Sequence, residues 1–148
     1  MKYHQGLFRP HNPDKYAGNP SRIIYRSNYE FKFMRWLDSH PDVISWQSEE
    51  FFIPYQSPID GRYHRYFPDF KFTKRDKNNL LETVVVEVKP ASQAKPPKKN
   101  VTKITRRHLQ EQKTYAINIA KWNAAEKYCA DRGYKFSIIT EKELGLIR

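Results

Sequence analysis

The most informative hydrophobic pattern in the chain is Val84–Pro90, VVVEVKP, in which two charged residues interrupt an apolar run. Because side chains alternate between the faces of a strand, Glu87 and Lys89 share one face and the intervening valines share the other. The pattern therefore predicts a central strand with an apolar face toward the core and a polar face. Burying unpaired charge is costly, so the polar face is a candidate functional site.

Hydrophobic periodicity predicts the other elements as well. In SNYEFKFMRWLDSHP, Ser27 and Glu30 match the S-x-x-E capping box, and the apolar face that follows predicts a helix of about three turns. Segments rich in aromatic and β-branched residues predict a meander of three consecutive strands, over 49–55, 61–72 and 80–90. A helix over 108–133, with a break near Asn118 left open, precedes a strand over 134–140 and a short terminal helix.

The predicted order α-β-β-β-α-β indicates an α/β fold with a mixed central sheet flanked by helices. A right-handed crossover through the second helix would place the last strand parallel to a strand of the meander. Residues 1–20 lack periodicity and predict an extended N-terminal arm that lies on the domain. With 148 residues, we expect the chain to form a single domain over 1–148.

The charge of the chain narrows the class of partner. Lys and Arg number 27 against 16 Asp and Glu, and the formal charge of +11 indicates a polyanionic partner, most commonly nucleic acid. A ribosomal-type binder or a membrane-surface protein would share this balance. Residues 91–107 form a predicted basic loop without acids, which would follow a DNA backbone or serve only as a disordered solubilising loop. Its basic residues are Lys95, Lys98, Lys99, Lys103, Arg106 and Arg107.

Cysteine content and hydropathy exclude other classes. Cys129 is the only cysteine, which excludes an internal disulfide and a cysteine-based zinc cluster and fits a packing role in a reducing cytosol. No apolar run approaches the length that spans a membrane, and the N-terminus lacks the apolar segment of a signal peptide. We therefore expect a soluble intracellular protein without a membrane partner.

A second acid precedes the interrupted strand. If the RYFPDF segment runs antiparallel to Val84–Pro90, Asp69 and Glu87 can lie side by side. Two carboxylates about 4 Å apart repel by about 4 kcal/mol at an effective dielectric near 20, so they require a cation between them. Carboxylate oxygens favour Mg²⁺, for which Mn²⁺ would substitute. Lys89 would orient or deprotonate the attacking water, so the pattern predicts a metal-dependent phosphodiesterase site.

The strings Pro68-Asp69 and Glu87-Val88-Lys89 resemble the PD-(D/E)XK nuclease superfamily, whose restriction-endonuclease-like core runs α-β-β-β-α-β. This resemblance implies that Glu30, Asp69 and Glu87 hold one or two Mg²⁺ ions and that the carbonyl of Val88 is a further ligand. It also implies that Lys89 positions the water for in-line attack and that the products carry a 5′-phosphate and a 3′-hydroxyl.

Over most of the chain, strings such as YRSNYE, RYFPDF, VEVKP and AKWNAAEKYCADRG resemble the head-completion nucleases of tailed phages. TnsA-type transposon endonucleases share several of these landmarks, although Gln often stands in them where this chain has Glu87. The resemblance implies DNA as the substrate and phage portal or head proteins as partners. It also implies the host cytoplasm as the location, with association with the virion left open.

Each candidate has a structural alternative. Glu30 could serve only to cap its helix, Glu87 and Lys89 could form a salt bridge on a solvated face, and Asp69 could be an exposed turn acid. Further candidates are the phosphate contacts Arg26, His64 and Arg65, the metal-facing Gln112, and the base-stacking Tyr63 and Tyr66, whereas Trp122 and Tyr128 are predicted core residues. At the level of function, the alternatives are a structural completion factor with a vestigial site, a transposon-type endonuclease and a Holliday-junction resolvase.

Overall fold

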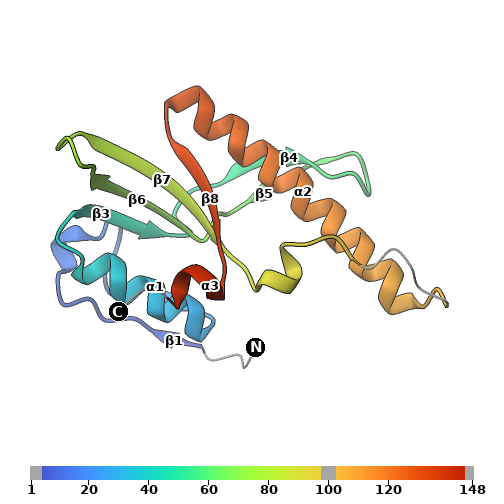
Figure 1. Cartoon of the computed structure of the whole chain (residues 1–148), viewed down its shortest axis with the longest axis horizontal. Helices are drawn as coiled ribbons and strands as arrows, with labels where there is room; N and C mark the ends of the chain where they lie inside the picture. Colours follow the sequence, from blue (N-terminus) through green and yellow to red (C-terminus); the bar gives the residue numbers. More distant parts are fainter. Residues whose placement is uncertain (1–4, 98–102, 146–148) are drawn as a thin grey trace.

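A four-stranded mixed sheet forms the centre of the computed structural model, which describes residues 5–97 and 103–145 (Figure 1). The strands lie in the order β3-β6-β7-β8; β6 is antiparallel to both of its neighbours, and β8 is parallel to β7. Their bounds are β3 Val43–Ser48, β6 Phe70–Arg75, β7 Leu81–Val88 and β8 Lys135–Ile139. The predicted mixed sheet and the parallel last strand are confirmed.

Two helices cover opposite faces of this sheet (Figure 1). Helix α1 (Asn28–Ser39) packs Phe33, Met34 and Leu37 against the sheet face that carries Val84 and Val86. Helix α2 (Arg106–Arg132) packs Trp122 and Ala125 with the β8 side chains of the opposite face. The remaining helices are short: the 3-10 helices η1 (Pro13–Lys15) and η2 (Ala91–Gln93), and the terminal helix α3 (Glu141–Leu144).

Helix α2 corrects two expectations. It is continuous through the buried Asn118, so the suggested break there is absent. It begins at Arg106, because the Thr105 hydroxyl accepts a hydrogen bond from the His108 N–H and caps the first turn. The last two basic residues of the predicted 91–107 loop therefore belong to the helix. Gly133, with φ of 72°, ends the helix in the left-handed conformation, as predicted.

The prediction that 49–55, 61–72 and 80–90 form one three-stranded meander is wrong. The first strand of the central sheet is β3, which the sequence pattern did not indicate, and 49–55 contributes instead to a separate hairpin. In that hairpin β4 (Ile53–Gln56) pairs only with β5 (Tyr63–Tyr66). The predicted strand 61–72 is divided between two sheets. Pro68 lies at the division, where its missing N–H leaves no donor for a continuous ladder.

The N-terminal segment is held against the domain by α1. Short strands β1 (Gly6–Leu7) and β2 (Ile24–Tyr25) pair antiparallel. The buried carboxylate of Asp38 accepts hydrogen bonds from the backbone N–H groups of His11, at 2.8 Å, and Asn12, at 3.1 Å. This segment therefore contains a strand and a 3-10 turn in addition to extended chain.

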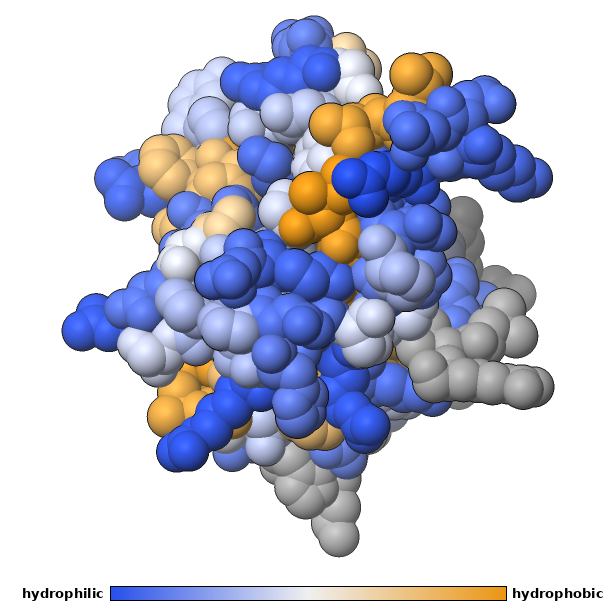
Figure 2. Space-filling view, turned by 90° about the vertical axis from the view of Figure 1, so that its left-hand side faces the viewer, coloured by the Kyte–Doolittle hydropathy of each residue, from blue (hydrophilic) through white to orange (hydrophobic). Residues whose placement is uncertain are grey.

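Of the predicted core residues, Trp122 and Cys129 are buried and Tyr128 is partly buried. Trp122 is 5% exposed, Cys129 is 1% exposed and unpaired, and Tyr128 packs against the cluster beneath α2. None of the helices in the described residues is apolar and long enough to cross a membrane. The face shown in Figure 2 is mostly hydrophilic, with hydrophobic residues in a few separate groups.

Candidate active site

Asp69 and Glu87 meet where β6 begins and β7 ends. The antiparallel register pairs Phe70 with Val86, so the next positions outward on the two strands are Asp69 and Glu87. Asp69 lies just before β6, and its carboxylate accepts a hydrogen bond of 2.8 Å from the Val88 N–H. The structure therefore brings together the two carboxylates that the sequence pattern predicted to be neighbours.

Burial and mutual repulsion dominate the electrostatics of this pair. The pKa of Asp69 is raised well above its ordinary value, first by burial and then by the charges of Glu87 and Glu30. Burial also raises the pKa of Glu87, which is 7% exposed, against the opposing effect of Lys89. The Lys89 ammonium lies 3.7 Å from the Glu87 carboxylate. Two desolvated carboxyl groups in this position suit a divalent cation, which would replace the proton that the pair otherwise retains.

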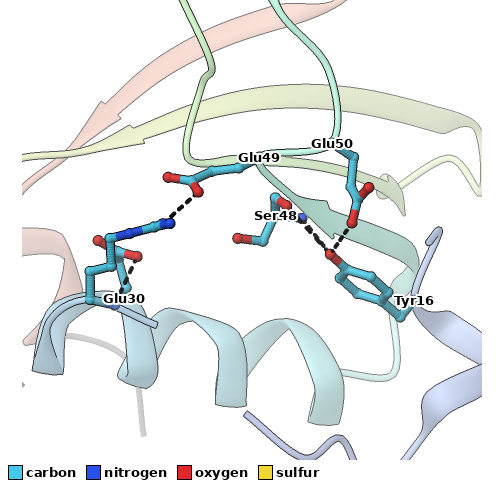
Figure 3. A network of polar contacts seen from close by, with 6 residues as sticks. Tyr16, Glu30, Ser48, Glu49 and Glu50 are labelled. Atoms are coloured by element: carbon cyan, nitrogen blue, oxygen red, sulfur yellow. Dashed lines mark hydrogen bonds and ion pairs between the residues drawn. The ribbon is translucent and has the colours of Figure 1, made fainter. Parts of the chain in front are cut away.

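Glu30 lies in the first turn of α1 (Figure 3), close enough for its charge to act on Asp69. Its backbone N–H donates to the Ser27 hydroxyl, which forms one half of the predicted capping box. Its carboxylate accepts from the Arg26 N–H at 3.3 Å and not from the Ser27 N–H that the box requires. Burial raises the pKa of Glu30, and the charges of Glu49 and Glu87 add to the effect. In the described residues, no three Asp, Glu, His or Cys side chains are already arranged to hold a metal ion. The contact with the Arg26 N–H holds the Glu30 carboxylate at the start of α1.

Glu49 is a neighbour of the cluster that the sequence analysis did not select. It follows β3 with φ of 54°, in the left-handed region, and its N–H donates to the Asp69 carbonyl at 3.2 Å. Its carboxylate pairs with the Arg26 guanidinium, whereas the adjacent Glu50 turns away to accept from the Tyr16 hydroxyl at 2.8 Å (Figure 3). The sequence signal for Glu49 was its place in WQSE (46–49), which also resembles the head-completion nucleases.

Helix α2 brings a second cation to the site, Lys121, which the sequence analysis did not select. The Lys121 ammonium lies 5.8 Å from the ring centroid of Tyr55 and 5.7 Å from that of Tyr66. Lys121 is half-buried; burial lowers its pKa, and the Glu87 charge opposes this shift. The only sequence signal for Lys121 as a site residue was its place in the AKWNAAEK string.

The prediction that Tyr66 stacks on bases is wrong. Tyr66 is 3% exposed, and its hydroxyl donates to the Glu87 carboxylate at 2.8 Å. Burial and the Glu87 charge raise the pKa of Tyr66, so the hydroxyl keeps its proton and remains a donor. Tyr66 therefore orients a site carboxylate. Tyr63, by contrast, is 74% exposed.

The remaining predicted contacts have partners of their own. His64 pairs with Asp60 at 2.8 Å, and the Arg65 guanidinium lies 4.9 Å from the ring centroid of Phe52. Gln112 makes its hydrogen bond, of 3.0 Å, with His108.

The basic residues after Lys89 border a hollow beside α2. Lys95 and Arg107 line a cavity of about 640 Å³ with polar side chains that include Gln93, Gln110 and Asn118. Arg107 also pairs with Glu111 at 3.2 Å. Of the other predicted contacts, Lys103 and Arg106 are exposed, whereas Lys98 and Lys99 lie outside the described residues.

Comparison with known proteins assigns the chain to a family. The model of the family described as TnsA-like endonuclease N terminal matches residues 40–141, a span that contains Asp69, Glu87, Lys89 and Lys121. The chain belongs to this TnsA-like endonuclease family. Its activity is accordingly that of a nuclease. The match to the TnsA-like model begins after Glu30, so it covers the Asp69–Glu87 pair and not the helix acid.

A head completion nuclease of Enterobacteria phage T4 is 38% identical to this TnsA-like chain over 144 residues. The similarity covers 95% of the chain and 93% of the phage T4 protein.

Proposed function

We propose that this protein is a divalent-metal-dependent DNA endonuclease of the PD-(D/E)XK type that acts in phage head completion. The observation that carries the proposal is the buried Asp69–Glu87 pair with Lys89 beside it, in a member of the TnsA-like endonuclease family. The likeness to the phage T4 head completion nuclease supports the biological role. DNA is the proposed substrate, and portal or head proteins are the proposed partners in the host cytoplasm.

Asp69 and Glu87 would hold Mg²⁺ or Mn²⁺, with the Val88 carbonyl and, after release from the Arg26 N–H, Glu30 as further oxygen donors. When bound there, the cation supplies Lewis-acid stabilisation of the negative charge that develops on the scissile phosphate. The repulsion within the pair supports this assignment, because a cation offsets it.

The protein's own groups fix the geometry of the reaction. The Val88 N–H holds Asp69 and the Tyr66 hydroxyl holds Glu87, so each carboxylate keeps oxygen lone pairs directed into the site. Lys89 orients the attacking water in line with the leaving oxygen and carries positive charge toward the phosphate. Water attacking in line with the 3′-oxygen would break the P–O3′ bond, and protonation of the departing oxygen leaves a 3′-hydroxyl on one product and a 5′-phosphate on the other.

The direct test compares Lys89→Met with Lys77→Met, which removes an exposed lysine in the turn between β6 and β7. With duplex and branched DNA and Mg²⁺, we expect Lys89→Met to lower the single-turnover cleavage rate by at least about 100-fold, in the range of losing a positioned catalytic group. Lys77→Met should cleave as the wild type does, and chelator should abolish all cleavage. Wild-type cleavage by Lys89→Met would refute the mechanism.

A further inference from the structure

One face of the β4–β5 hairpin carries solvent-exposed aromatic side chains. Side chains of the other face, including Ile53, Tyr55 and Tyr66, are buried in the cluster with Trp122 of α2. Because side chains alternate along each strand, the remaining positions point away from α2. These exposed residues, called the hairpin face below, are Phe52, Pro54, Gln56, Tyr63, Arg65 and Phe67.

The hairpin face has the chemistry of a base-stacking surface. Phe52 is 44% exposed, Phe67 is 45% exposed, and their ring centroids lie 5.8 Å apart. Arg65, which pairs with Pro54 across the strands, places its guanidinium over the Phe52 ring. The face contains this cation and no acid, on a chain of net charge +11. Exposed aromatic rings beside arginine are the features that bind unstacked bases together with their phosphates.

The end of the hairpin face that holds Phe52 and Phe67 is also close to the reacting centre. Phe67 precedes Asp69 by two residues, so their Cα atoms lie within about 7 Å of each other, the reach of a fully extended chain. Phe52 follows Glu49, whose N–H bonds to the Asp69 carbonyl, by three residues. A phosphate at the Asp69–Glu87 pair would therefore place the neighbouring nucleotides of its strand beside this face. A paired base is already stacked within its duplex, so the rings gain most from a base that is unpaired.

We propose that the hairpin face binds unpaired bases next to the cleaved phosphate, and that the substrate is consequently DNA with an unpaired stretch or a branch at the cut. This inference rests on the nuclease function proposed above and adds a substrate class to it. Phe52 and Phe67 stack on the unpaired bases, and Arg65 contacts the phosphate between them. A fully paired duplex contacts only the basic residues through its phosphates, so it binds more weakly.

The experiment measures binding in chelator, where no cleavage is expected. Fluorescence anisotropy compares a fully paired duplex with a duplex of the same length that contains a short unpaired stretch carrying 2-aminopurine. The wild type should prefer the unpaired DNA by at least about tenfold and quench the 2-aminopurine on binding, as stacking requires. Phe52→Ala and Phe67→Ala should each reduce this preference at least about threefold and restore the fluorescence, with little change in duplex affinity.

Two further variants make the comparison specific. Phe52→Trp preserves a stacking ring and should retain the preference. Leu80→Ala removes an exposed apolar side chain in the turn between β6 and β7, at the far end of those strands from Asp69, and should behave as the wild type. Circular dichroism of each variant tests whether it is folded, and Phe52→Trp provides the readout if an alanine variant is not.

Equal wild-type affinity for the two DNAs, or an equal loss for both in Phe52→Ala, would overturn the inference. So would self-association of the wild type that Phe52→Ala abolishes while the DNA preference persists, because the face would then be a protein interface. Failure of the nuclease function has a different signature. In that case the preference for unpaired DNA would be intact, but Mg²⁺ would produce no cleavage of either DNA.

Discussion

At the scale of single residues, the ionised Asp69–Glu87 pair lowers the stability of the folded protein. Two buried carboxyl groups with raised pKa values favour the protonated form, so without a bound cation the folded protein is strained by their ionisation. In the proposed nuclease, a cation bound by the same desolvated oxygens would offset this cost. The clearest consequences are in the pH dependence of stability and in the lysines that surround the pair.

Because the pKa of Asp69 is raised in the folded state, its proton contributes stability that is complete below the unfolded pKa, about 4. This contribution is lost as the pH rises through the raised folded pKa. In chelator we therefore expect the melting temperature to fall as the pH rises from about 4 through the raised pKa of Asp69. Asp69→Asn, whose amide oxygen can still accept from Val88, should flatten the fall while abolishing cleavage.

Thermal denaturation across this pH range, with and without Mg²⁺, measures the effect. Mg²⁺ should reduce the wild-type fall, because bound cation replaces the lost proton. Glu126→Gln, an exposed change on α2, should keep the wild-type slope. A melting temperature with the same slope in Asp69→Asn and the wild type would contradict the assignment of the shift to this pair.

Lys121 offers a second test among single residues. Its ammonium lies over Tyr66, whose hydroxyl orients Glu87, so it adds positive charge behind the site. We expect Lys121→Met to lower the single-turnover cleavage rate by about 10-fold or more, the order of losing one charge-stabilising group. Lys121→Arg should recover part of the rate, and Lys127→Met, which removes an exposed lysine of the same helix, should have no effect. Equal rates for Lys121→Met and Lys127→Met would remove Lys121 from the site.

At the scale of elements, the site depends on how α1 is anchored. The buried carboxylate of Asp38, near the end of α1, accepts hydrogen bonds from the backbone of His11 and Asn12 and so ties the N-terminal segment to the helix. Asp38→Ala should lower the free energy of unfolding by about 2–3 kcal/mol, because these two buried donors lose a charged acceptor. Chemical denaturation should show this loss, with little change for Asp42→Ala, an exposed acid beyond the helix. A change below about 0.5 kcal/mol would show that the anchor is unimportant.

The elements that the sequence predicted well are those specified by local chemistry. The Ser27 cap and the Gly133 terminus follow from residues a few positions apart, and each is present. The polar face predicted for β7 is limited to its carboxyl end, because Val85, on the same face as Glu87, is fully buried. The β4–β5 hairpin was misassigned because its sheet membership depends on the pairing of distant segments. Pro68 was the local signal that the predicted strand 61–72 divides, but it does not determine which strand β5 and β6 each pair with.

The candidate site shows the same limit. Asp69 and Glu87 were predictable because a hairpin between β6 and β7 sets their register. Glu49 and Lys121 were not selected, because they reach the cluster through the turn after β3 and through the packing of α2. The burial of Tyr66 was missed for the same reason, since α2 covers its side of the hairpin.

At the scale of the whole molecule, the charge of +11 should govern affinity for DNA. The logarithm of the binding constant should fall linearly with the logarithm of salt concentration, with a slope of about −0.9 for each phosphate neutralised. Lys95→Ala, in the basic hollow beside α2, should reduce the magnitude of the slope by about one unit, whereas Lys77→Ala should not. Anisotropy titrations at several salt concentrations measure both slopes, and identical slopes would place Lys95 outside the DNA-binding surface.

The position of the catalytic cation tests the account most directly. Crystals of the protein soaked in Mn²⁺ should give an anomalous difference peak between the carboxylates of Asp69 and Glu87, on the side that Lys89 faces. Parallel soaks of Asp69→Asn crystals should lose that peak. A strong peak held by other residues, with none between these two carboxylates, would contradict the account.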